Sequence, residues 1–199
     1  MTLHIHCGDA RQLGAALRRW RALRRIKQDH AGALLGVSQA TVSRWENGRQ
    51  APDPDEQTRL RTLMQARLDS AADRELARLV EHSQRPVHLV CDLTHRLLAL
   101  SPARQRQCRL PRAELLGRSL WRYASAEIIE AESRLAALDW FGPAAPALEI
   151  RTGANDDRAA VSIEPSRCRW VRFQLADGSF ARLVETLDGY TSESSHGTN

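Results

Sequence analysis

The residues that could do chemistry in this chain are concentrated in a short polar stretch between residues 39 and 47. If this stretch is a helix, its outward side chains are those of Gln39, Ala40, Ser43, Arg44 and Asn47. Gln39 and Arg44 can each make two hydrogen bonds to one base edge. A helix that only faces solvent would more often carry Glu and Lys at such positions. The chemistry predicted here is recognition of nucleobases.

Two short helices joined by a tight turn would present this stretch. The apolar residues recur at helical spacing, at Ala31, Leu34, Leu35, Val42 and Trp45. Gly36 suits the turn because glycine adopts the left-handed conformation at little cost. Ser38 can cap the second helix with its hydroxyl. Residues 27–48 are therefore predicted to form a helix-turn-helix unit. An ordinary helical hairpin has the same period, but the ordered combination of these residues favours the helix-turn-helix.

Residues 13–64 resemble the Xre family of phage-repressor-like helix-turn-helix domains, over about a quarter of the chain. The matching residues are LGAALRRWRALR, then Gln28, LLGVSQATVSRWENG and Pro52. The resemblance implies a bundle of four or five helices whose third helix enters the major groove. One departure is Ala31-Gly32, where the family usually has Leu-Ala; the pattern tolerates it, with at most a slight loosening of the core.

The resemblance also implies roles for individual residues. The residues expected to face bases are Gln39, Ala40, Ser43 and Arg44. Those expected to face phosphates are Gln28, Ser38, Asn47 and Arg49. An arginine of the first helix pairs in such domains with the glutamate before the last glycine, which implies an Arg21–Glu46 ion pair.

The positive charge lies in the same half of the chain. The net charge is +5, and residues 1–70 contain 12 Arg or Lys against 7 Asp or Glu, whereas residues 71–199 contain 17 of each. A phosphate-binding surface needs this excess, because neutralised phosphates release counterions. A merely soluble basic helix would explain the sign of the charge but not its segregation.

Composition excludes several classes of protein. No apolar run is long enough for a transmembrane helix, and the first residues show no signal-peptide pattern. The four cysteines are scattered without C-x-x-C pairing, which favours a reduced, cytoplasmic protein. His4, His6 and Cys7 are possible metal ligands, but no fourth ligand is close in sequence, so we expect no metal site and a loose or edge segment there.

The DNA-binding domain is expected to span residues 9–68. Asp9 with Gln12 fits a capping box for a first helix that continues to about Ile26. Asp53 followed by Pro54 predicts the start of a closing helix. Residues 69–84 are interpreted as a connecting helix, with Ala72, Leu76, Leu79 and Val80 spaced for burial. That helix could pair with its copy in a dimer or pack onto its own second domain.

A second domain is predicted over residues 85–189. Short apolar runs at 87–93 and 96–101 indicate a hairpin, residues 112–125 and 127–138 indicate helices, and 147–151 indicates a strand. Strands in VSIEP and RWVRFQLADGSFARLVETLDG follow, with an Asp177-Gly178 turn. This order resembles a PAS domain over roughly 76–189. The expected fold class is thus an all-α helix-turn-helix bundle plus an α+β PAS-like domain, an antiparallel sheet with helices on one face. Residues 190–199 are predicted to be disordered.

No catalytic constellation is found in the second domain, so an enzyme is not expected. The only lysine, Lys27, lies in the DNA-binding half, which excludes self-cleavage by a serine and lysine there. Cys108 is only superficially similar to the reactive cysteine of flavin-binding light sensors. His82, His88 and His95 could ligate haem iron but are more often plain core or loop residues. The resemblance implies dimerisation or binding of a small molecule, and the sequence does not identify a cofactor.

These observations predict a bacterial, cytoplasmic, sequence-specific transcription regulator. It would bind double-stranded DNA as a homodimer on a palindromic operator, because two recognition helices then reach major grooves about 34 Å apart. The second domain would dimerise and could sense a ligand. The alternative is a protein-interaction module, for instance an antitoxin, in which DNA binding is secondary.

Overall fold

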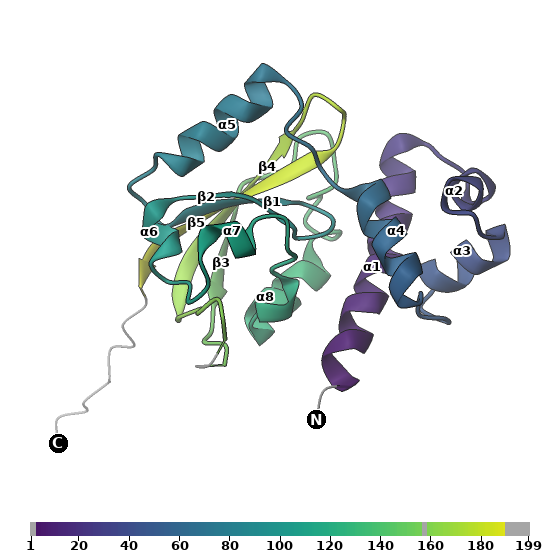
Figure 1. The fold of residues 1–199 in the computed structure, drawn as a ribbon, viewed down its shortest axis with the longest axis horizontal. Helices are drawn as coiled ribbons and strands as arrows, with labels where there is room; N and C mark the ends of the chain where they lie inside the picture. The colour runs from purple at the N-terminus through teal and green to yellow at the C-terminus, as the bar shows by residue number, and fades with distance from the viewer. Residues whose placement is uncertain (1–2, 157–158, 190–199) are drawn as a thin grey trace.

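The computed structural model describes residues 3–156 and 159–189. A helical bundle at the amino-terminal side is followed by an antiparallel sheet with helices against it (Figure 1). The tail at 190–199, predicted to be disordered, lies outside the described residues, as do the side chains of His4, His6 and Cys7.

The bundle consists of α1 (Leu3–Arg24), α2 (Gln28–Leu35), α3 (Gln39–Glu46) and α4 (Pro54–Met64). Its buried apolar residues are Leu13, Ala16, Leu17, Trp20, Ala31, Leu35, Val42, Trp45, Leu60 and Met64. The prediction of a helix starting at Asp9 was wrong, because α1 begins at Leu3 and Asp9 lies inside it. Leu34, predicted to be buried, is 52% exposed, because the buried face of α2 is that of Ala31, Gly32 and Leu35.

The predicted cap of α4 is present. The Asp53 carboxylate accepts from the Glu56 backbone N–H at 2.8 Å, and the Glu56 side chain accepts from the Asp53 N–H. Pro54 occupies the first turn, where its missing N–H costs nothing. This closed capping box fixes where the bundle's last helix begins.

The connecting helix α5 (Ala71–Glu81) packs onto the chain's own sheet, one of the two arrangements left open by the sequence. Ala77 and Val80 are buried in the same core as strand residues. Ala72 and Leu79, predicted to be buried, are exposed, because the buried face of the helix is instead that of Asp73, Ala77 and Val80.

The sheet has the strand order β2-β1-β5-β4-β3, and each pair is antiparallel. Its strands are β1 (Val87–Cys91), β2 (Leu97–Leu100), β3 (Leu148–Thr152), β4 (Ser166–Gln174) and β5 (Phe180–Gly189). Gly178 in the β4–β5 turn has a φ of +77°, as the predicted Asp177-Gly178 turn requires. The VSIEP segment is not a strand, and forms only an isolated bridge between Val161 and Cys108.

Helices α6 (Pro102–Gln105), α7 (Arg112–Leu115) and α8 (Ala126–Arg134), with the 3-10 helix η1 (Trp121–Tyr123), lie between β2 and β3 in the chain. The predicted helix over 112–125 was wrong beyond Leu115. Gly117, at a φ of +79°, turns the chain out of the helix. The short helix α6 was not predicted.

The predicted fold class is confirmed: a helical domain precedes an antiparallel five-stranded sheet with helices. Helices α6 to α8 and η1 lie over one face of the sheet, and α5 covers part of the other (Figure 1). The two domains share one core, because Met64 and Ala66 of the bundle side pack with Cys91 and Ala181 of the sheet. The Ala66 N–H donates to the Cys91 sulfur at 3.3 Å.

Candidate functional site

The helix-turn-helix is formed by α2, a turn at Gly36 and α3. Gly36 has a φ of +70°, and its N–H closes the end of α2. The Ser38 hydroxyl accepts from the Thr41 backbone N–H at 3.1 Å, which caps α3. These local signals place the first turn of α3 on the surface, with its N-terminal residues exposed.

Two glycines allow the helices to approach closely. A Cβ added to Gly14 in α1 would lie 2.1 Å from the Trp45 carbonyl oxygen, and one added to Gly32 would lie 2.6 Å from the Val37 carbonyl oxygen. Ala31 beside it is fully buried. Glycine at position 32 is what permits this contact, which gives the Ala31-Gly32 departure from the family pattern a packing reason.

A chain of hydrogen bonds ties α1 to the first turn of α3. Arg21 donates from Nε and Nη2 to the two oxygens of Glu46, at 2.6 Å each. This is the ion pair implied by the family resemblance, and the Glu46 side chain is only 2% exposed. Gln28 then donates to Glu46 at 2.8 Å, and Gln39 donates to Gln28 at 2.6 Å. Hydrogen bonding to Glu46 raises the pKa of Arg21.

The residues expected to face bases lie together on the outer side of α3. Gln39, Ala40 and Arg44 are exposed and Ser43 is half-buried. The Arg44 Nε donates to Gln50 at 2.8 Å, and its Nη2 donates to Thr41 at 3.2 Å. The Arg44 side chain is thus held along the exposed surface of α3. Gln50 and Thr41 were not predicted, although their spacing of six and three residues from Arg44 places them within reach of it.

The residues expected to face phosphates surround this surface but differ in what they already bind. Asn47 and Arg49 are exposed beyond the end of α3. Ser38 is exposed but caps α3. Gln28 is half-buried, and both ends of its amide are used, by Glu46 and by Gln39. Gln28 therefore supports the position of Gln39 in this structure.

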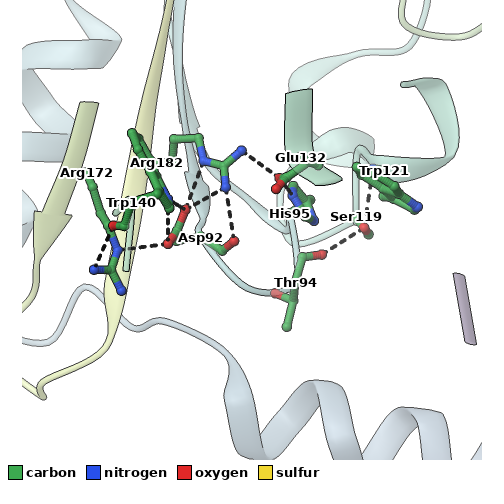
Figure 2. Close-up of polar contacts among 9 residues, drawn as sticks. All are labelled: Asp92, Thr94, His95, Ser119, Trp121, Glu132, Trp140, Arg172 and Arg182. Atoms are coloured by element: carbon green, nitrogen blue, oxygen red, sulfur yellow. Dashed lines mark hydrogen bonds and ion pairs between the residues drawn. The ribbon is translucent and has the colours of Figure 1, made fainter. Parts of the chain in front are cut away.

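The second domain contains a buried ionic network that the sequence analysis missed (Figure 2). Arg182 donates to Asp92 at 2.7 Å and to Glu132 at 2.7 Å, and Arg172 donates to Asp92 at 2.9 Å. The Trp140 indole N–H also donates to Asp92, at 3.1 Å. These side chains come from β5, β4, α8 and two loops. The sequence signal that could have predicted this network is an arginine on each strand of the hairpin around Asp177-Gly178. Arg172 and Arg182 lie opposite each other across that hairpin.

The charges in this network stabilise one another. Burial alone would raise the pKa of Glu132, but the charges of Arg182 and His95 hold it well below its ordinary value. Burial likewise opposes the charge of Arg182, and Glu132 and Asp92 raise its pKa above the ordinary value. The network links the inner face of the sheet to α8 and to the loop that carries Trp140.

The histidines and the cysteine considered for cofactor binding differ in their surroundings, although His88 and His95 both border one cavity. His82 is exposed at the end of α5, and His95 pairs with Glu132. His88 is buried on β1 and faces a cavity under the sheet. Cys108 does not border that cavity, and burial raises the pKa of its thiol. Within the described residues, no three potential metal ligands cluster.

None of the helices in the described part of the chain combines the length and apolar character that spanning a membrane requires.

Comparison with known proteins agrees with this arrangement in the amino-terminal part. A family model described as "Helix-turn-helix domain" matches residues 12–76. No curated protein matches the chain.

Several solved structures are similar to it. The PAS domain of an HTR-like protein from Haloarcula marismortui is 17% identical, covering 59% of this chain and 91% of its own, with a TM-score of 0.42. A PAS domain from Desulfitobacterium hafniense is 18% identical, covering 56% and 98%, with a TM-score of 0.40. An RNA-binding Light-Oxygen-Voltage receptor is 14% identical, covering 89% and 59%, with a TM-score of 0.42. From the match to residues 12–76, the chain carries a helix-turn-helix domain, which indicates DNA binding.

Proposed function

We propose that this protein is a sequence-specific transcription regulator of the Xre type, a binding protein and not an enzyme. It binds a palindromic operator as a homodimer, with α3 in the major groove. The observation that carries the proposal is the exposed row of Gln39, Ala40 and Arg44 on α3. The Arg21–Glu46 ion pair holds the other side of α3 against α1. Such bracing holds a recognition helix at a fixed angle to the bundle.

The phosphate contacts of this proposal come from the rim of the same surface. Asn47 and Arg49 are exposed at the end of α3, and the first 70 residues hold the chain's excess of positive charge. Contacts of this kind give affinity without sequence preference, whereas Gln39 and Arg44 give the preference.

The second domain joins two chains and senses a small molecule in this proposal. Its support is the shared core between the bundle and the sheet, since a change in the sheet domain then changes the position of the bundle. Native mass of the full chain tests dimerisation, and a monomer at operator-saturating concentration would contradict it.

The proposed reading of bases is tested with Arg44→Ala and Arg49→Ala. Preferred sequences are first selected from a random pool of DNA duplexes with the full chain. Arg44→Ala should then weaken binding to the selected sequence by about 1–3 kcal/mol and relax the preference at one position. Arg49→Ala should weaken binding to all sequences and lower the salt dependence. Equal loss for Arg44→Ala on all sequences would show a phosphate contact only.

The alternative of a protein-interaction module would be favoured by an exposed apolar patch on the sheet at 147–187. Among the described residues of that range, no large hydrophobic side chain is exposed. The alternative therefore has no observation of its own, and a copurifying partner protein would be the evidence for it.

A further inference from the structure

A cavity of about 510 Å³ lies between the inner face of the sheet and the segment from α6 to α8. Pockets for small organic molecules commonly measure ~300–1,000 Å³. Much of its wall is apolar or aromatic, including Val90, Trp121, Tyr123, Ile128, Trp170 and Val184. Aromatic walls of this kind favour a ligand whose body is largely apolar and contains a ring.

The charged part of the lining is mostly positive. In the part of the chain that is described, its charged side chains, histidines aside, are Arg85, Arg104, Arg106, Arg182 and Glu164. The charge of Arg182 is neutralised by its ion pairs with Asp92 and Glu132. Arg85 pairs with Glu185 at 2.5 Å. Arg104 and the exposed Arg106 remain, and the exposed carboxylate of Glu164 in the same lining offsets one of these two charges, so the net excess is one positive charge.

Arg104 is the unneutralised cation that lies deepest. No carboxylate within the described chain forms an ion pair with it, and its Nη1 donates only to the Gln107 side chain, at 2.6 Å. Burial lowers the pKa of Arg104, which reflects the cost of removing its charge from water. A guanidinium in this position is stabilised by any anion that enters the cavity.

His88 borders the same cavity from β1 and is 8% exposed. Its Nδ1 is buried and has no hydrogen-bond partner among the described residues. Leaving a buried polar group without a partner costs free energy, which a ligand that pairs with it would recover. Arg104 lies near enough for its charge to act on His88. Arg104 therefore has one acceptor, the Gln107 side chain, and the Nδ1 of His88 has none among the described residues.

We propose that this cavity binds an organic carboxylate with a flat apolar body. The carboxylate accepts hydrogen bonds from the Arg104 guanidinium and from an N–H of the His88 imidazole, and the body packs against Trp121 and Trp170. A guanidinium and a carboxylate match in shape and charge. One unneutralised arginine balances a monoanion and falls short of a phosphate dianion. The proposal rests on the sensing role given above and names its ligand class.

The test uses two probes of equal shape, 2-naphthoate and 2-naphthamide, of which only the first is charged. Calorimetric titration of the full chain without DNA should show the carboxylate binding about tenfold tighter than the amide, because a hydrogen bond to a charged group is worth about 1.5–3 kcal/mol. Arg104→Gln should abolish this preference and leave amide binding unchanged. The matched control is Arg106→Gln, an exposed arginine of the same lining, which should keep the preference.

Equal affinity for the two probes, no binding of either at millimolar concentration, or an unchanged preference in Arg104→Gln would overturn the proposal. Displacement of 2-naphthoate by inorganic phosphate at equal concentration would overturn the carboxylate class. His88→Gln, which should reduce the preference about fivefold, keeps the test decisive if Arg104→Gln does not fold. If the chain binds the carboxylate but shows no sequence-dependent binding to DNA, the proposed function is wrong and this inference still holds.

Discussion

The guanidinium carbon of Arg19 lies 4.5 Å from the centre of the Phe141 ring, so α1 of the helical bundle touches the loop that follows α8. Phe141 also lies 5.5 Å from the guanidinium carbon of Arg172, which binds Asp92 in the buried network of the sheet domain. Phe141 therefore connects the helix that braces α3 with the ionic network beside the cavity.

Replacing Phe141 by Leu keeps an apolar side chain but removes the aromatic face. A cation–π contact of this kind is worth about 1 kcal/mol, a factor of about five in an equilibrium constant. We expect the Ala66 amide, which is bonded to Cys91 between the domains, to exchange its hydrogen about fivefold faster. The control is Arg18→Ala, an exposed neighbour on α1. Unchanged exchange in Phe141→Leu would show that the contact does not hold the domains together.

Replacing Glu46 by Gln removes the charge that the half-buried Arg21 faces. Breaking a largely buried pair leaves an uncompensated charge, so the free energy of unfolding should fall by about 2–3 kcal/mol. DNA affinity should fall as well, because Glu46 also holds Gln28, which holds Gln39. Urea denaturation and a DNA-binding titration measure the two effects. The control, Glu75→Gln, breaks an exposed pair with Arg78 and should change little. Similar stability losses for the two variants would contradict the assigned role.

Replacing Gly14 by Ala should destabilise the bundle although alanine favours helices. The new Cβ would lie 2.1 Å from the Trp45 carbonyl oxygen, which is backbone and cannot rotate away. Overpacking of this kind costs about 1–3 kcal/mol, more than the propensity gain of about 1 kcal/mol. Thermal unfolding measures the loss. Gly36→Ala, which has open space but a φ of +70°, should be destabilised by backbone strain alone while α1 and α3 stay in contact. Higher stability of Gly14→Ala would disprove the close contact.

The neutral state of His88 predicts how stability depends on pH. Burial, with the charges of Arg104 on α6 and Arg182 on β5, lowers the pKa of His88 well below its ordinary 6.5. Below pH 6.5 the unfolded chain therefore binds a proton that the folded chain does not, and the free energy of unfolding falls as pH falls. The slope is about 1.4 kcal/mol per pH unit until the folded pKa is reached.

Comparing the chain with its His88→Gln variant isolates this contribution, because every other titratable group is present in both proteins. Denaturation at pH 7.5 and pH 5.5 should show that the unsubstituted chain loses about 1 kcal/mol more than the variant. Parallel losses in the two proteins would mean that His88 is protonated in the folded state.

Local sequence signals predicted the elements that depend on neighbouring residues. Ser38, Gly36 and Asp53 mark helix ends through contacts within a few residues, and the Asp177-Gly178 turn needs only the glycine at positive φ. The exposed row on α3 follows from helical spacing alone. The Arg21–Glu46 pair came from resemblance to a family and not from spacing.

Local signals also predicted two helix boundaries wrongly. The extent of α1 and the break at Gly117 were not predicted, because helix-favouring residues lie on both sides of each boundary.

The sequence by itself determined a helix-turn-helix with an exposed polar row and a charge excess beside it. Only the tertiary structure decided that Arg104 and His88 line one cavity. It also decided that Asp92 forms ion pairs with two arginines and that Arg19 contacts Phe141. The physical reason is the separation along the chain between the groups that make each contact. Caps and turns are fixed by hydrogen bonds within one turn of the chain, whereas these groups are far apart in sequence and are brought together only when the sheet and the bundle bury a common core.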